Sequence, residues 1–93
     1  MSDPLEELRR EIAAVDREML ELIARRVELA RRVGRAKHAA KAATLDPQRE
    51  ATVVREAAVR AREAGLPDDE IRQIFWQLIG LCRRAQEEGD GRG

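Results

Sequence analysis

The fold is decided by residues 4–40, which read PLEELRREIAAVDREMLELIARRVELARRVGRAKHAA. Apolar side chains recur there in steps of three and four residues, which places them on one face of a helix: Leu5, Leu8, Ile12, Val15, Met19, Leu22, Leu29, Val33, Ala36 and Ala40. Asp3 and Pro4 are suited to the N-cap and the first helical position. Gly34 costs about 1 kcal/mol relative to Ala, which weakens a helix without ending it. The segment therefore predicts a single helix of about 36 residues, roughly 54 Å long.

Two shorter helices are predicted to follow. The first clear break falls at residues 44–47 (TLDP), where Asp46-Pro47 repeats the pattern of an N-cap and a first helical residue. The helix that begins there should run to about residue 62, and Gly65 fits the left-handed position that ends it. A third helix should then begin with the acidic residues 68–70 in its first turn, where the helix dipole favours anions. Since no alternating pattern or hairpin turn indicates a strand, the fold class is all-α.

The length of the first helix indicates a dimer. A compact chain of 93 residues has a radius of gyration of only about 12 Å. The two shorter helices cannot cover a rod of roughly 54 Å. Its apolar face should therefore be buried against another chain, most simply an antiparallel copy of itself. We expect residues 1–93 to form a single domain that assembles as an intertwined C2 homodimer of six helices.

The composition limits the classes of function. The chain has 18 Lys and Arg residues against 18 Asp and Glu residues, and its aromatic residues are Phe75 and Trp76. Zero net charge and the lack of a stacking surface argue against a nucleic-acid partner. Cys82 is the single cysteine, so no disulfide can form within the chain. No segment has the length of a membrane span or the apolar core of a signal peptide, which favours a cytoplasmic protein without a membrane partner.

Three polar side chains occupy positions where the helical pattern calls for apolar ones. Arg26 interrupts the apolar stripe of the first helix, and Lys37 lies on nearly the same face about 16 Å further along. Gln86 ends the apolar face of the third helix that includes Ile79 and Cys82. Burying two cations there is costly unless anions meet them.

Each of these residues also has an ordinary interpretation. Arg26 could reach solvent or pair with a glutamate, Lys37 could be a solvated surface lysine, and Gln86 could belong to the polar surface near the end of its helix. Together they could instead set the register of a non-catalytic helical dimerisation module. One histidine and one cysteine, without a motif for metal or phosphate binding, leave little basis for metal or covalent chemistry.

Two groups of residues carry a resemblance to a known family. The first helix contains Leu8-Arg9-x-x-Ile12-x-x-Val15-Asp16 and then Leu22-Ile23-x-x-Arg26-x-x-Leu29-Ala30-x-x-Val33-Gly34-x-x-Lys37. The second helix begins with Asp46-x-x-Arg49-Glu50, and Gln86 stands near the end of the third helix. With these motifs the chain resembles the all-helical chorismate mutases from about residue 4 to about residue 88. The resemblance implies a homodimer in which the long first helix crosses its twin, with two active sites.

The resemblance also implies roles for the matching residues. Arg26 and Arg9 would bind the two carboxylates of chorismate, with Arg9 reaching in from the other protomer. Lys37 and Gln86 would donate hydrogen bonds to the ether oxygen. Helical geometry agrees with the cross-chain role, because Arg9 lies about 100° from Arg26 around the helix and off the inward face of its own chain.

The second and third helices would complete the site. In the family that the chain resembles, Asp46 and Glu50 would address the ring hydroxyl, and Arg49 would support the network around the carboxylates. The ordinary interpretations are a helix cap for Asp46 and a surface pair for Arg49 and Glu50. Cys82 stands where the family often has a serine near a substrate carboxylate, a departure that weakens one polar contact.

The implied reaction suits this set of residues. Rearrangement of chorismate to prephenate is a unimolecular step, so no nucleophile, metal or cofactor is expected. The protein has to hold the reactive conformer and stabilise the charge that grows on the ether oxygen. The nearest alternative is isochorismate pyruvate lyase, which shares the fold and forms salicylate. The regular spacing Asp46-x-x-Arg49-Glu50 favours the mutase over the lyase.

Overall fold

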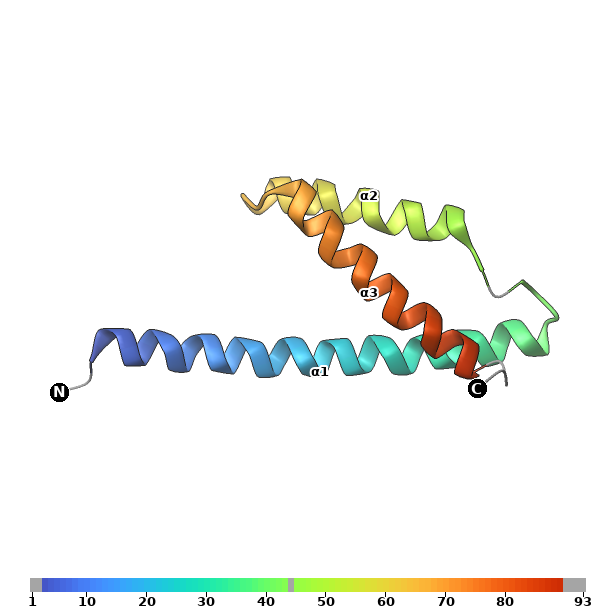
Figure 1. The fold of residues 1–93 in the computed structure, drawn as a ribbon, viewed down its shortest axis with the longest axis horizontal. Helices are drawn as coiled ribbons and strands as arrows, with labels where there is room; N and C mark the ends of the chain where they lie inside the picture. The colour runs from blue at the N-terminus through green and yellow to red at the C-terminus, as the bar shows by residue number, and fades with distance from the viewer. Residues whose placement is uncertain (1–2, 44, 90–93) are drawn as a thin grey trace.

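The structure is a computed structural model that describes residues 3–43 and 45–89. The described chain forms three helices, α1 (Pro4–Ala39), α2 (Pro47–Glu63) and α3 (Asp68–Gly89), and no strand (Figure 1). The predicted all-α fold, with a first helix of 36 residues, is confirmed. Thr44, at which the predicted break begins, lies outside the described residues.

Local hydrogen bonds and backbone angles explain three of the helix boundaries. The carboxylates of Asp3 and Asp46 accept from the backbone N–H groups of Leu5 and Arg49 respectively, and each aspartate is followed by a proline in the first turn. Gly65, with a φ of 74°, occupies the left-handed position after α2. The capping pattern in the sequence therefore predicts these boundaries correctly.

The end of α1 has an uncommon residue in a common motif. Lys41 has a φ of 56°, and its N–H donates to the carbonyl of His38 over 3.1 Å. The N–H of Ala42 donates to the carbonyl of Lys37 over 2.8 Å. These two bonds form the Schellman arrangement, in which the left-handed position is usually glycine. The chain leaves α1 here and turns toward α2.

Packing against α3 holds the molecule together. In the described chain, α3 packs against both α1 and α2, whereas α1 and α2 do not pack against each other. The buried residues at these contacts are mostly small: Ala30, Gly34, Val54, Ala57, Ala58, Ala61, Ile79, Cys82 and Ala85. The helix continues through Gly34, as predicted, but the glycine has a further role. A Cβ at this position would collide with the backbone carbonyl of Gln86, so Gly34 lets the backbones of α1 and α3 approach closely.

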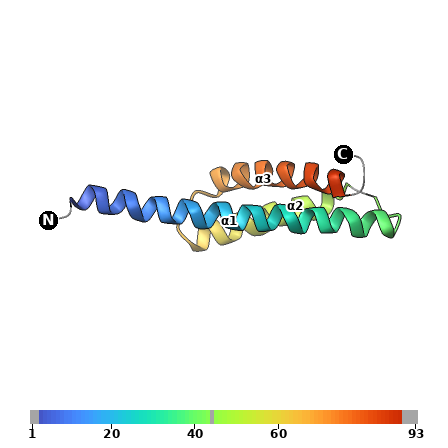
Figure 2. The same cartoon turned by 90° about the horizontal axis from the view of Figure 1, so that it is seen from below.

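The N-terminal end of α1 extends beyond the other two helices (Figures 1 and 2). The molecule measures 60 × 26 × 15 Å and has a radius of gyration of 16.9 Å, well above the roughly 12 Å of a compact chain of this length. A single copy therefore leaves much of its longest helix without a covering layer.

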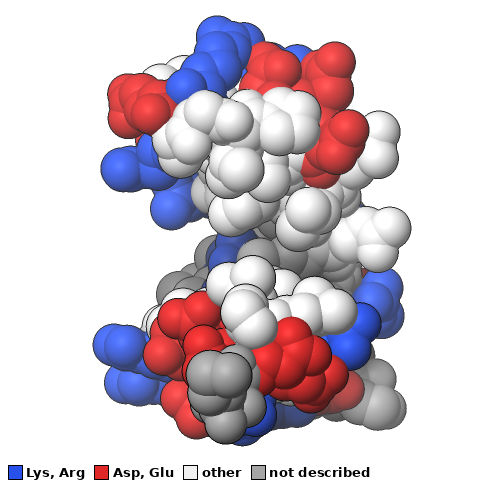
Figure 3. Space-filling model, turned by 90° about the vertical axis from the view of Figure 1, so that its left-hand side faces the viewer, with Lys and Arg blue, Asp and Glu red and all other residues white. Residues whose placement is uncertain are grey.

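The predicted apolar face of α1 is exposed in this single chain. Its larger members have relative exposures between 43% and 62% and are here called the α1 stripe: Leu5, Leu8, Ile12, Val15, Met19, Leu22, Leu29 and Val33. Figure 3, seen from the N-terminal end of α1, shows uncharged side chains on both sides of a hollow between α1 and the α2–α3 end. Neither α2 nor α3 buries the stripe, as the sequence predicts.

Candidate active site

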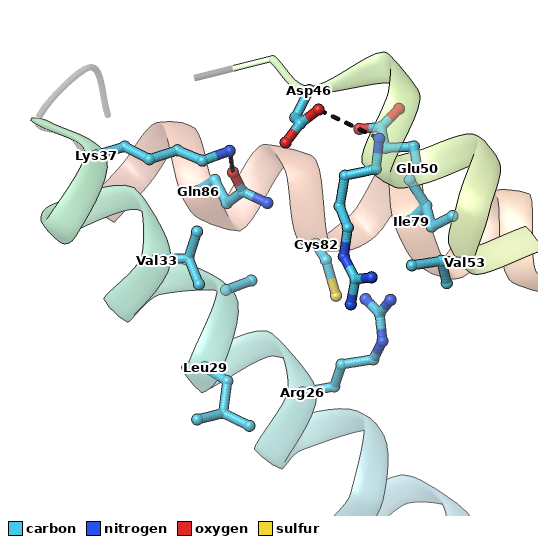
Figure 4. Close-up of a pocket in the computed structure, with 12 residues that line it drawn as sticks. Arg26, Leu29, Val33, Lys37, Asp46, Glu50, Val53, Ile79, Cys82 and Gln86 are labelled. Carbon is cyan, nitrogen blue, oxygen red and sulfur yellow. Dashed lines mark hydrogen bonds between the residues drawn. The ribbon is translucent and has the colours of Figure 1, made fainter. Parts of the chain in front are cut away.

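A cavity of about 550 Å³ lies between the C-terminal half of α1, the beginning of α2 and the second half of α3 (Figure 4). The residues that line it are Arg26, Leu29, Ala30, Val33, Lys37, Asp46, Arg49, Glu50, Val53, Ile79, Cys82 and Gln86. Every site residue predicted from the sequence except Arg9 is in this set. The structure thus brings together polar groups that are up to 60 positions apart in the chain.

Lys37 and Gln86 are joined by a hydrogen bond. The Nζ of Lys37 donates to the Oε1 of Gln86 over 3.2 Å, and the pair is partly buried (Figure 4). An ammonium group can only donate, so the amide has to present its oxygen to Lys37 and its NH₂ group elsewhere. In Figure 4 the amide nitrogen points toward the middle of the cavity. The bond therefore fixes the amide in an orientation that offers donors to a ligand.

Arg26 and Arg49 line the same cavity, together with the apolar side chains of Leu29, Val33 and Ile79. No ion pair of either arginine occurs within the described part of the chain. The pairing of Arg26 with a glutamate, which the sequence left open, is therefore not observed there. Guanidinium groups beside an apolar wall are suited to binding the carboxylates of a ligand.

Glu50 is paired with a residue that sequence reasoning missed. Arg83 of α3 donates through Nε to Oε2 of Glu50 over 3.0 Å and through a terminal nitrogen to Oε1. The hydrogen bond to Glu50 raises the pKa of the Arg83 guanidinium above its ordinary value. Glu50 is therefore paired across the fold with Arg83, and the expected surface pair of Arg49 and Glu50 is not observed within the described part of the chain. Arg83 and Glu50 are 33 positions apart, so no local pattern in the sequence predicts that they meet.

Arg9 lies outside the cavity. It is 17 positions before Arg26 on the same straight helix, which corresponds to roughly 26 Å. Its side chain is 64% exposed and pairs over 3.0 Å with Glu6, one turn away. Exposed pairs of this kind contribute little to stability, so Arg9 remains available to another binding partner.

Asp46 and Cys82 both line the cavity but differ in polarity. Asp46 caps α2 through the N–H of Arg49 over 3.2 Å, so its ordinary interpretation as a helix cap is correct, and it also lines the cavity. Cys82 is a free thiol, 3% exposed, in a small core cluster with Ala30 and Ala85. Its surroundings are those of a core residue that also contributes sulfur to the cavity wall.

Two further findings concern the part of the chain that the structure describes. It contains no group of three or more His, Cys, Asp or Glu side chains placed to hold a metal ion. None of its helices is both long and apolar enough to cross a membrane.

Comparison with known proteins agrees with this geometry. The family model described as chorismate mutase type II matches residues 8–87, which include every residue that lines the cavity. The chain belongs to the chorismate mutase type II family. The resemblance to the all-helical chorismate mutases is thereby confirmed.

A curated relative of this chorismate mutase-like chain is the T-protein of Haemophilus influenzae (strain ATCC 51907 / DSM 11121 / KW20 / Rd). The two are 35% identical over 77 residues, which cover 83% of this chain and 20% of the T-protein. The chain therefore spans about a fifth of the length of this relative.

Proposed function

We propose that this protein catalyses the rearrangement of chorismate to prephenate, a step in the biosynthesis of phenylalanine and tyrosine. The observation that supports it best is the hydrogen-bonded pair of Lys37 and Gln86 in a cavity that also holds Arg26 and Arg49. Chorismate is a dianion with an ether oxygen that gains negative charge as its C–O bond breaks. The cavity offers cations for the carboxylates and a pair of donors for that oxygen.

Orientation is the first contribution to catalysis. Arg26, with Arg49 in support, would hold one carboxylate of chorismate, and the apolar wall of Leu29, Val33 and Ile79 would enclose the ring. Fixing the flexible substrate in its chair-like conformer removes much of the entropic barrier to an intramolecular step. Asp46 and Glu50, both in the cavity wall, would accept a hydrogen bond from the ring hydroxyl. Cys82 would line the cavity without a strong polar contact.

Stabilisation of charge is the second contribution. The ammonium group of Lys37 and the amide of Gln86 would both donate to the ether oxygen. Such donors interact more strongly with the transition state than with the ground state, because the oxygen is more negative there. They need no proton transfer, which suits a reaction that neither gains nor loses atoms.

A homodimer would complete this site. The α1 stripe is exposed in the single chain, and an antiparallel α1 from a second copy would cover it. The same crossing would bring Arg9 of one protomer to the cavity of the other, where the substrate's second carboxylate needs a cation. Mixing Arg9→Ala and Arg26→Ala variants tests this arrangement. Random exchange of subunits makes half of the dimers mixed, and each mixed dimer has one intact site out of two. The mixture should therefore regain about a quarter of wild-type activity. No recovery would reject a shared site.

The activity itself is tested with purified protein by the loss of chorismate absorbance and the appearance of prephenate. Lys37→Ala should lower kcat about a hundredfold or more, by analogy with the loss of an oxyanion donor. Arg35→Ala is a matched control, because Arg35 is a cation one half-turn away, 56% exposed and outside the cavity wall. Isochorismate is assayed in parallel. Release of salicylate would favour the pyruvate lyase, and inertness toward both substrates would favour a dimerisation module.

A further inference from the structure

The acidic side chain of Glu50 lines the cavity but is held by a residue outside it. One planar guanidinium, that of Arg83, engages both carboxylate oxygens of Glu50 in a two-pronged arrangement. The Glu50 side chain is 17% exposed and the Arg83 side chain 37% exposed. Partial burial reduces solvent screening, so the pair is more firmly fixed than the surface ion pairs of this chain.

The cavity wall contains groups that could compete with a ligand. Arg26 and Arg49 carry the positive charge that the proposed function requires for the substrate carboxylates, and Glu50 follows Arg49 directly in the chain. An unrestrained glutamate at this position would be an internal carboxylate able to occupy the same guanidinium groups. A ligand would then have to displace it before binding. The pairing with Arg83 turns this carboxylate toward α3 and compensates its charge.

We propose that Arg83 is a positioning residue of this site: it holds the Glu50 carboxylate against α3, so that Arg26 and Arg49 stay available to a dianionic ligand. The inference rests on the proposed function, because it presumes a ligand with two carboxylates. Each Glu50 oxygen keeps a second acceptor position, so the restrained carboxylate can still receive a ligand hydroxyl. Arg83 itself does not line the cavity and acts through Glu50.

A purely structural role makes a different prediction. The pair connects α2 to α3, so it could serve only to hold these helices together. In that case the loss of Arg83 would lower the midpoint of thermal unfolding and leave the ligand affinity of the folded protein unchanged. Affinity, and not stability, therefore separates the two interpretations.

The experiment measures prephenate binding by titration calorimetry and chorismate turnover by steady-state kinetics. Arg83→Gln should weaken prephenate binding and raise the KM for chorismate about tenfold, the loss typical of a charge-assisted contact. The kcat should change less than about threefold, because a competing carboxylate weakens ground-state and transition-state binding alike. Arg84→Gln, which makes the same change at the exposed neighbouring position, should leave both quantities unchanged.

A second background isolates the role of Glu50. In a Glu50→Gln protein residue 50 has no carboxylate that could compete, so adding Arg83→Gln should change prephenate affinity less than about twofold. A tenfold loss that persists in this background would overturn the inference, as would unchanged affinity in Arg83→Gln alone. If Arg83→Gln does not fold, Arg83→Lys replaces it, since lysine keeps the charge without the fork. Its expected loss of affinity is about threefold.

The two proposals fail in different ways. A wild-type protein that neither binds prephenate nor converts chorismate would reject the proposed function, and the inference with it. A wild-type protein that does both, with an Arg83→Gln variant of equal affinity and KM, would reject the inference alone.

Discussion

The two halves of α1 share one periodic pattern but have different surroundings. The C-terminal half packs on α3 through Ala30 and Gly34 and directs Arg26 and Lys37 into the cavity. The N-terminal half begins with turns that extend beyond α2 and α3 (Figure 2). Its apolar side chains, such as Ile12 at 60% exposure, have no covering layer in the single chain. The stripe itself stays exposed along both halves. The buried residues of α1 that pack against α3 are Ala30 and Gly34, which lie beside the stripe and are small.

This difference shows what a heptad pattern does and does not specify. It indicates that one face of a helix is to be buried, but it does not say which chain covers it. In α1 the pattern belongs to the expected contact with a second copy, whereas a neighbouring face with Ala30 and Gly34 makes the contact within the chain. The two faces together would let one helix serve both a dimer and an active site.

The largest expected effect comes from a charge in the N-terminal half. Ile12→Asp would place an unpaired carboxylate in the expected dimer interface, at a cost of at least about 3 kcal/mol for each copy. We expect monomers by analytical ultracentrifugation and a loss of activity above a hundredfold. Ala13→Asp, at an exposed position beside the stripe, is the control and should remain dimeric. If Ile12 stays exposed in solution, its substitution should instead change stability by less than about 0.5 kcal/mol.

The next largest effect tests the donors that the C-terminal half brings together. Gln86 does not titrate, so kcat of the wild-type protein should stay nearly constant from about pH 5 to pH 8. In Gln86→Glu the introduced carboxyl group can donate only when protonated, and its ordinary pKa is about 4.3. Its kcat should therefore be about a hundredfold lower at pH 7 and should rise as the pH falls toward 5. A steep fall of wild-type kcat over that range would contradict the assignment of Gln86.

Much of the fold and the site could be predicted from the sequence because the signals are local. Asp3-Pro4, Asp46-Pro47 and Gly65 each determine a helix boundary through their own backbone neighbours. Arg26 and Lys37 lie on one helix, so periodicity alone places them on one face. The family resemblance supplied the residues of the other two helices that join them.

Contacts between helices could not be predicted in the same way. The pairing of Arg83 with Glu50 depends on how α2 and α3 pack, and nothing in its neighbourhood distinguishes Arg83 from Arg84. From the sequence, Gly34 is expected only to weaken the helix. The sequence does not show that the carbonyl of Gln86 lies against this glycine. Such features depend on tertiary packing, which overrides local propensity.

A substitution at Gly34 tests the contact that the C-terminal half of α1 makes with α3. Gly34→Ala places a Cβ against the backbone carbonyl of Gln86, which cannot move without shifting α3. We expect a loss of about 3 kcal/mol in the free energy of unfolding, measured with urea, and a lower kcat as Gln86 is displaced from Lys37. Gly80→Ala is the matched control, since its nearest neighbour is a terminal nitrogen of Arg84 at 3.7 Å. It should instead stabilise the protein by about 0.5–1 kcal/mol.

The smallest effect concerns the end of the C-terminal half, where the carbonyl of Lys37 is held by the turn that follows α1. Lys41 occupies the left-handed position of this turn with a φ of 56°. Lys41→Gly relieves that strain, although the more flexible unfolded chain offsets part of the gain, and we expect a net stabilisation of about 0.5 kcal/mol. Ala42→Gly, at a position with negative φ, has no strain to relieve and should destabilise the protein by about 0.5–1 kcal/mol. Since neither residue lines the cavity, kcat should not change. Opposite shifts in the midpoint of thermal unfolding at unchanged kcat would show that the turn affects stability and not catalysis.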